Sequence, residues 1–271
     1  MKKVQIFAIA LVIIAFGAGS LAAQSLKGMS FNGSTGLYSI PSGRVGWEQT
    51  ANIGLDIGYH LIAGDGNVTH IPKAALTLFR LWELNFAVDI QPKSPDVEQN
   101  SGTNVIFGTK FQFPTGNRIA VSLGGNFQIL KSRAEGPYVH DNAGQIYLAM
   151  TYPGSFFTWP SETTVVLGYT FGTDLPNGNI DYGMGFDLVL LPDVFQNMIH
   201  WIIDFSNFTY VALPPGYALS TARGFLNTGI RIDFASIIRQ ERFKIALDII
   251  MTDAFDSNRG FAFGGVFGIG L

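Results

Sequence analysis

The chain contains no cysteine in 271 residues, which excludes disulfide bonds, thiol catalysis and lipid attachment at an N-terminal cysteine. Charged residues are scarce at 14% and the formal net charge is −3, so the composition does not indicate a nucleic-acid partner. After residue 16 no apolar run approaches the roughly 20 residues that a membrane-spanning helix needs. Yet 47% of the residues are hydrophobic, so they must be arranged in another way.

The first 23 residues have the three parts of a secretion signal. Lys2 and Lys3 are followed by an apolar stretch at residues 4–16 and by a mostly small stretch at residues 17–23. This order predicts a cleavable signal peptide, residues 1–23, that is cut near Ala22 or Ala23. The alternative is an uncleaved anchor helix, for which residues 4–16 are short. Export of a cysteine-free chain fits a bacterial envelope protein.

From Thr50 to Leu271 the chain repeats, about twelve times, a segment in which apolar residues alternate with polar or small ones. In the first segment Ala51, Ile53, Leu55, Ile57, Tyr59 and Leu61 alternate with Asn52, Gly54, Asp56, Gly58 and His60. A period of two predicts a β-strand with one apolar and one polar face. The other segments are residues 73–81, 83–91, 104–113, 118–129, 144–152, 163–171, 180–190, 199–209, 224–234, 242–252 and 260–271. Two are less regular, because the alternation puts Phe79, Ile202 and Phe208 on polar faces.

The connections between these segments alternate in character along the chain. One set is polar or rich in glycine and proline, at residues 63–70, 92–103, 132–142, 172–179, 210–223 and 253–259. The other set includes tight turns at residues 81–82 and 114–116 and a mid-length link at residues 153–162. Single-chain bacterial barrels have an even number of strands, long external loops and short periplasmic turns. The alternation therefore predicts a barrel over residues 50–271 whose strand number lies at about 12, within a range of about 10–14.

We predict an all-β fold, a transmembrane antiparallel up-and-down β-barrel, because twelve apolar faces need an apolar solvent. A soluble β-sandwich or lipocalin-like barrel is the alternative, but it would have to enclose all twelve faces around one core. Trp47, Trp82, Trp159 and Trp201 fall near the predicted periplasmic ends, where an interfacial girdle is expected. The last segment, 260–271, resembles the C-terminal targeting strand of outer-membrane barrels, which implies the barrel-assembly machinery as a partner.

Before the first strand, residues 32–44 read Asn-Gly-Ser-Thr-Gly-Leu-Tyr-Ser-Ile-Pro-Ser-Gly-Arg, and residues 52–59 follow as Asn-Ile-Gly-Leu-Asp-Ile-Gly-Tyr. This resembles the N-terminal motif of YjbH-like outer-membrane β-barrels, a Gly-Leu and a Pro-Thr-Ala stretch before a Gly-Tyr strand. Here Ser42 and Gly43 replace the Thr-Ala pair. The resemblance implies an outer-membrane location and a link to exported polysaccharide, and it transfers no catalytic residue. Pro41 and the glycines predict a turn-rich segment, residues 24–49, that is periplasmic or lies in the barrel lumen.

If the apolar faces contact lipid, the polar faces line the interior, and they carry eight acidic and five basic residues. The lumen-lining candidates are Asp56, Lys73, Glu83, Asp89, Lys110, Arg118, Asp181, Asp187, Asp204, Arg231, Asp233, Lys244 and Asp248, together with His60. One hypothesis is a hydrated, slightly cation-favouring pore in which these charges set selectivity. The other is a lumen closed by ion pairs and glycine packing, because unpaired buried charges are costly. A barrel of about twelve strands lies between filled and open sizes, so both hypotheses stand.

The four histidines give no metal or catalytic pattern. Their spacing is not that of a metal site, and His60 lies about 13 Å along the strand from Asp56, too far for a direct dyad. His70 and His140 fall in predicted external loops, where we expect them to be solvated. The outward faces are nearly all apolar and offer no Ser–His site. We therefore expect no enzyme activity, no metal and no cofactor.

Together these patterns predict an outer-membrane β-barrel that acts as a passive channel for small hydrophilic solutes. The alternative is a non-conducting structural or envelope-assembly barrel that is linked to polysaccharide export. The expected surroundings are outer-membrane lipid on the apolar face and small hydrophilic solutes in the lumen. The longer loops, residues 92–103 and 210–223, are the candidates for contact with a ligand or a host.

Overall fold

The structure is a computed structural model that describes nine stretches of the chain. They are residues 28–64, 67–91, 102–115, 119–131, 142–171, 180–208, 224–235, 242–255 and 260–271. The predicted signal peptide and the whole connection at residues 210–223 lie outside these stretches.

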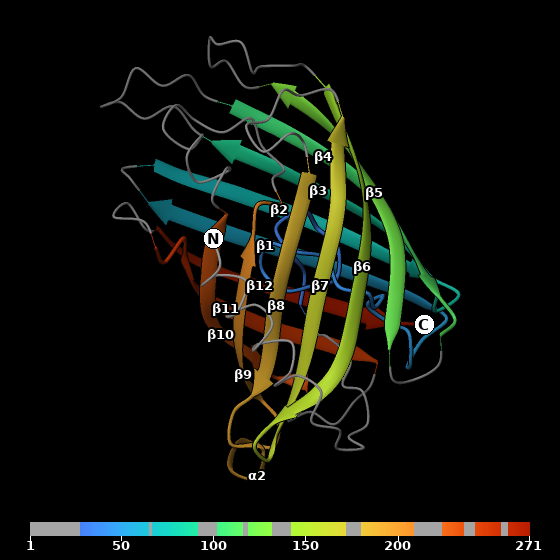
Figure 1. Cartoon of the computed structure of the whole chain (residues 1–271), viewed down its shortest axis with the longest axis vertical. Helices are drawn as coiled ribbons and strands as arrows, with labels where there is room; N and C mark the ends of the chain where they lie inside the picture. The colour runs from blue at the N-terminus through green and yellow to red at the C-terminus, as the bar shows by residue number, and fades with distance from the viewer. Residues whose placement is uncertain are drawn as a thin grey trace, which may run out of the picture.

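Twelve strands form one closed antiparallel barrel, as the alternating pattern predicts (Figure 1). Each strand pairs with the next along the chain, and the last pairs with the first, so the sheet has no free edge. The strands are β1 (Ile53–Gly64), β2 (Asn67–Leu78), β3 (Trp82–Gln91), β4 (Gly102–Phe113), β5 (Ala120–Lys131), β6 (Asn142–Phe156), β7 (Trp159–Phe171), β8 (Ile180–Val189), β9 (Ile199–Ser206), β10 (Phe225–Asp233), β11 (Phe243–Thr252) and β12 (Gly260–Gly270).

The two faces of each strand lie in opposite surroundings. In β1 the side chain of Ile57 is 56% exposed, whereas that of the adjacent Asp56 is 1% exposed. Large apolar side chains point outward all around the barrel, for example Phe107 on β4, Leu167 on β7 and Phe263 on β12. An apolar exterior around a closed sheet is stable in lipid, where every backbone group must be bonded internally. The barrel wall is therefore built to span a membrane.

Several strands extend beyond the bounds that periodicity predicts. Residues 63–70 and 153–162 are not connections: β1 and β2 pair out to Gly64 and Asn67, and β6 and β7 pair as far as Phe156 and Trp159. Ladder hydrogen bonds need no apolar side chain, so pairing continues where the alternation fades. Phe79 lies in the turn after β2 with φ 54° and is 70% exposed, so it does not occupy a polar face.

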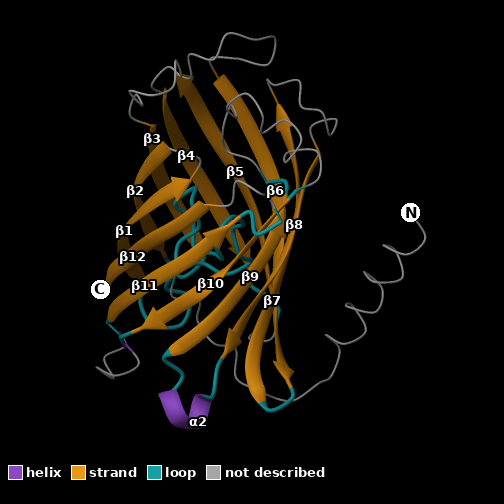
Figure 2. Cartoon of the chain, turned by 90° about the vertical axis from the view of Figure 1, so that its left-hand side faces the viewer, coloured by secondary structure: helices purple, strands orange, loops and turns teal. Residues whose placement is uncertain are grey.

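The connections at one end of the barrel are short. They include the turns at residues 79–81 and 157–158 and the link between β8 and β9, which contains the helical turn α2 (Pro192–Phe195). We call this the short-turn end, and α2 marks it in Figures 1 and 2. In the described stretches no helix has both the length and the apolar character that crossing a membrane requires.

Residues 28–48, which precede β1, lie inside the barrel. Residues 28–48, called the lumenal segment here, form the loop that runs between the strands in Figure 2. Two isolated bridges, Met29↔Thr35 and Gly36↔Pro41, fold this segment back on itself. All of its residues are buried except Phe31 and Glu48, which are partly buried.

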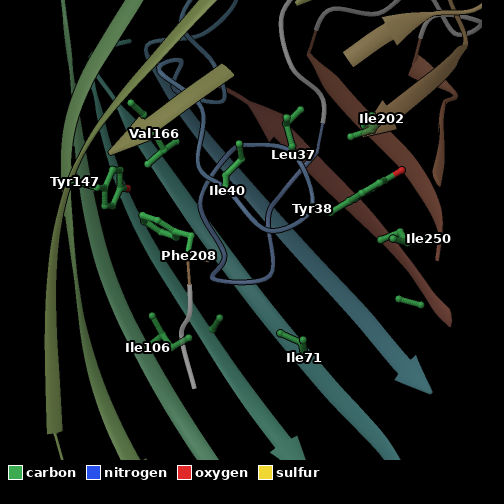
Figure 3. Close-up of a cluster of buried hydrophobic side chains, with 13 residues drawn as sticks. Leu37, Tyr38, Ile40, Ile71, Ile106, Tyr147, Val166, Ile202, Phe208 and Ile250 are labelled. Atoms are coloured by element: carbon green, nitrogen blue, oxygen red, sulfur yellow. The ribbon is translucent and has the colours of Figure 1, made fainter. Parts of the chain in front are cut away.

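The lumenal segment carries part of an apolar core that lies within the barrel rather than around it. Leu37, Tyr38 and Ile40 project from it toward inward-facing residues of the wall (Figure 3). The wall residues of this core are Ile71, Ala87, Ile106, Tyr147, Ala149, Val166, Ile202, Ile250 and Ala262, and Phe208, which follows β9, also belongs to it. Ile202 and Phe208 thus break the predicted alternation because the interior itself is partly apolar.

Candidate functional site

The barrel interior gathers the charged residues that the polar faces predict. The structure places thirteen of the fourteen lumen-lining candidates at inward positions, each at most 8% exposed. They are Asp56, His60, Lys73, Glu83, Asp89, Lys110, Asp181, Asp187, Asp204, Arg231, Asp233, Lys244 and Asp248. The remaining candidate, Arg118, lies outside the described residues. So many buried charges require partners, because an uncompensated buried charge costs several kcal/mol.

Two wall carboxylates receive backbone N–H groups of the lumenal segment. Glu83 on β3 accepts from Thr35 N at 2.8 Å through one oxygen and from Gly46 N at 3.1 Å through the other. Asp204 on β9 accepts from two consecutive backbone nitrogens, Tyr38 N at 2.8 Å and Ser39 N at 2.7 Å. Such charge-assisted bonds are stronger than bonds between neutral groups. The two carboxylates therefore hold the segment from different sides of the barrel.

Two wall lysines bind the backbone carbonyl groups of the same segment. Lys73 Nζ on β2 donates to Met29 O at 3.1 Å and to Ser30 O at 2.7 Å. Lys110 Nζ on β4 donates to Thr35 O at 3.0 Å and to Arg44 O at 2.7 Å. Lys110 also forms an ion pair with Glu83 at 3.1 Å. A lysine and a carboxylate on neighbouring strands thus bind adjacent parts of one peptide.

Toward the short-turn end, both a side chain and a backbone N–H group of the lumenal segment bond to the wall. Arg44 forms ion pairs with Glu162 on β7 at 3.0 Å and with Glu48 at 2.7 Å. The side chain of Gln112 on β4 accepts from Val45 N at 2.8 Å.

Glu162 is not among the predicted lumen-lining residues, because it falls in the predicted connection 153–162. Extending the period of two back from Thr164 would have placed it on the inward face.

Trp47 covers the seam where the first and last strands meet. Its Nε1 donates to Asp56 on β1 at 3.1 Å, and Lys244 Nζ lies 4.3 Å from its ring centroid. A Cβ atom added at Gly54 would lie 2.1 Å from the Trp47 ring, and one at Gly270 would lie 2.7 Å from it. Small residues on both sides of the seam therefore make room for the indole.

The placement of Trp47 corrects the predicted aromatic girdle. Trp47 is 1% exposed in the interior and cannot contact the membrane interface. Trp82 and Trp201 do lie on the outward face, 42% and 41% exposed, and donate to Thr109 and Thr228. A position near a predicted strand end was not enough to place Trp47 at the interface, because Trp47 precedes β1 and belongs to the buried lumenal segment.

A second ionic cluster joins strands on both sides of the seam. Asp248 on β11 accepts from Arg231 on β10 at 2.7 and 3.2 Å, and His60 on β1 contacts it at 3.1 Å. Arg231 also donates to Gly36 O at 3.2 Å. His60 and Asp248 meet only because β12, which carries Gly264 between them, closes the barrel. No local spacing could have predicted this pair.

Part of the wall from β5 to β8 has hydrogen bonds that run between wall side chains rather than to the lumenal segment. Asn126 donates to Gln145 at 2.8 Å, and Gln145 donates in turn to Asp181 at 3.0 Å. Asp181 also accepts from Thr170 at 2.6 Å. Both hydrogen-bond partners of Asp181, Gln145 and Thr170, thus belong to the wall and not to the lumenal segment.

The predicted loop position of His70 is wrong. His70 is not in a loop: it lies on β2, and its ring contacts the Tyr59 hydroxyl on the neighbouring strand. His140 lies outside the described residues. His200, which was not singled out, pairs with Asp187 at 2.7 Å in the interior. Among the described residues no group of three or more His, Cys, Asp or Glu side chains could hold a metal ion.

Solved structures with a similar fold include outer-membrane porins. A KdgM porin superposes with a TM-score of 0.50 at 7% identity, over 80% of this chain and 99% of that chain. A NanC porin superposes with a TM-score of 0.51 at 7% identity, over 80% of this chain and all of that chain (100%). At such low identity the likeness concerns the fold alone. No family model matches the chain and no curated protein matches it, so the YjbH-like resemblance has no support in these comparisons.

Proposed function

We propose that this chain is a bacterial outer-membrane channel for small hydrophilic solutes, and that the lumenal segment closes it in the conformation described above. The observation that carries the proposal is the space within the wall. The strands enclose residues 28–48 in a folded-back conformation, with most of their side chains. A barrel filled by its own wall residues has no room for a peptide. The wall alone therefore encloses a passage of at least that width.

The surroundings of the barrel follow from its two faces and its two ends. The outward apolar side chains favour outer-membrane lipid as the solvent, and the likeness to porins supports the same location. Short turns at the α2 end and longer stretches of sequence between strands at the other end favour a periplasmic short-turn end. The signal peptide at residues 1–23 would supply the export step. We assign no catalytic residue.

The inward charges favour cations once the lumenal segment moves aside. Carboxylates outnumber basic side chains on the described inward faces, and Glu83 and Asp204 would lose their peptide donors. Carboxylates that line a water-filled lumen attract cations and repel anions. We therefore expect a channel that conducts small cations better than small anions.

The proposal is tested by tethering the lumenal segment to the wall. Ser39 Oγ in the segment lies 2.8 Å from Ser206 Oγ on β9, so S39C/S206C places two sulfurs within reach of a disulfide. Because the chain has no other cysteine, the bond is unambiguous. In planar bilayers we expect discrete, salt-dependent current steps from the reduced variant. Oxidation should lower their frequency at least about tenfold, the effect of a shift of ~1.4 kcal/mol against opening.

The single variants S39C and S206C, given the same oxidant, are the controls and should conduct like the unmodified chain. Equal currents from the oxidised and the reduced double variant would show that the segment does not close the channel. Absence of current in both states would contradict the channel itself.

A non-conducting structural or envelope-assembly barrel is the second candidate. The observation in its favour is the apolar core within the barrel, in which Leu37, Tyr38 and Ile40 are at most 1% exposed. Apolar packing of this kind stabilises a fixed plug better than a mobile one. Absence of current in planar bilayers, from protein that still gives an intact barrel band on an unheated detergent gel, would favour this candidate.

A further inference from the structure

The wall recognises the main chain of the lumenal segment. Glu83, Asp204, Lys73 and Lys110 each make two hydrogen bonds to its backbone N–H or C=O groups. Each of these four side chains is at most 3% exposed. Main-chain groups are present in every peptide, so this set of charges forms a site for a polypeptide rather than for one side chain.

Glycines of the wall add pockets for three side chains of the segment. A Cβ atom added at Gly185 would lie 2.4 Å from Leu37, and one at Gly183 would lie 2.5 Å from Ile40. A Cβ atom at Gly229 would lie 3.0 Å from the Tyr38 hydroxyl. Any larger residue would therefore collide with the segment or displace it. The charges bind the backbone, and the glycine positions select the side chains.

The covalent link between the segment and the barrel adds little to these contacts. Gln49, Thr50 and Asn52 are exposed, whereas the segment before them is almost entirely buried. Residues 28–48 are thus held on several sides of the barrel by β2, β3, β4, β7 and β9, independently of the peptide bonds that lead into β1.

We propose that the barrel interior is a peptide-binding site, which this chain fills with its own residues 28–48 and which would bind the same peptide supplied as a separate molecule. The ligand class is an oligopeptide that folds back on itself and presents Leu, Tyr and Ile at the spacing of Leu37, Tyr38 and Ile40. This goes beyond channel activity, because it concerns what the interior binds and not what passes through it.

The test cuts the link in the folded, full-length protein. A protease recognition sequence is inserted between Gln49 and Thr50, and a dye is attached at Q49C, the single cysteine of that variant. After cleavage in detergent, the labelled N-terminal fragment is expected to elute with the barrel and to separate only after heating. Loss of the fragment from the unheated, cleaved protein on its first passage through the column would overturn the proposal.

Matched carboxylate variants test the recognition of the main chain. E83Q and D204N keep the shape of residues that bind the segment, and D181N changes a buried lumenal carboxylate whose bonds go to Gln145 and Thr170. We expect E83Q and D204N each to release the fragment about tenfold faster, as expected for loss of charge assistance, and D181N to release it at the original rate. An unheated gel confirms that each variant forms the barrel. Equal release from all three variants would contradict main-chain recognition by these charges.

Competition tests binding of the separate molecule. An excess of unlabelled synthetic peptide 28–48 should accelerate loss of the labelled fragment, whereas a peptide of the same composition in shuffled order should not. An equal effect of the two peptides would overturn the selective part of the proposal. Because no current is measured, this result is independent of whether the barrel conducts.

Discussion

The outward and inward faces of the same strands obey different rules. Outward, Ile57, Leu123 and Phe263 need only be apolar, because lipid adapts to any side chain. Inward, Asp56, Glu83 and Asp248 each have named partners at fixed distances. A fluid solvent covers one face and a fixed peptide covers the other. Substitutions should therefore be tolerated on the outside and costly on the inside.

The largest expected effect is at Asp248, which bonds to both Arg231 and His60. In D248A the Arg231 guanidinium stays buried without its carboxylate, which costs roughly 3–5 kcal/mol of barrel stability. The measurement is urea unfolding in lipid vesicles, followed by tryptophan fluorescence. L247A removes a larger side chain from the adjacent outward position, which is 47% exposed, and should cost clearly less. Equal losses in the two variants would show that the faces do not differ.

A somewhat smaller effect is expected at Trp47. W47A empties the space above Gly54 and Gly270 and removes the bond to Asp56, with a loss of about 3 kcal/mol, the lower part of the range for buried aromatic residues. The seam between β1 and β12 should then open first on heating. The temperature at which the compact gel band is lost measures this, and the outward W82A is the control, with a shift less than half as large. If W47A lost the compact band at the same temperature as the unmodified chain, the indole would not be what stabilises the seam.

The sequence predicts the strands of the wall far better than the lumenal segment and the contacts inside the barrel. Alternation around Asp56 and Ile57 is local, so it predicts the strands, their faces and the closed sheet that the structure shows. The pair of His60 and Asp248 depends on closure through β12, which brings together residues far apart in sequence. Trp47 and Arg44 follow no period, because the lumenal segment has no regular structure. Its position is determined by the wall, and no local pattern encodes it.

The smallest expected effect is an exchange between apolar residues on the outward face. L123I on β5 keeps an apolar side chain in contact with lipid, so stability should change by no more than about 0.5 kcal/mol. The inward comparison is I202L on β9, which keeps the volume but changes the branching of a side chain that is 0% exposed in the apolar core. Such a change in a packed interior costs up to about 1.5 kcal/mol. Urea unfolding measures the loss of stability in both variants. This pair gives the sharpest comparison of the two faces, because neither substitution alters charge or hydrogen bonding. If L123I lost as much stability as I202L, the outward face would be packed against a fixed partner, and lipid would not be its only solvent.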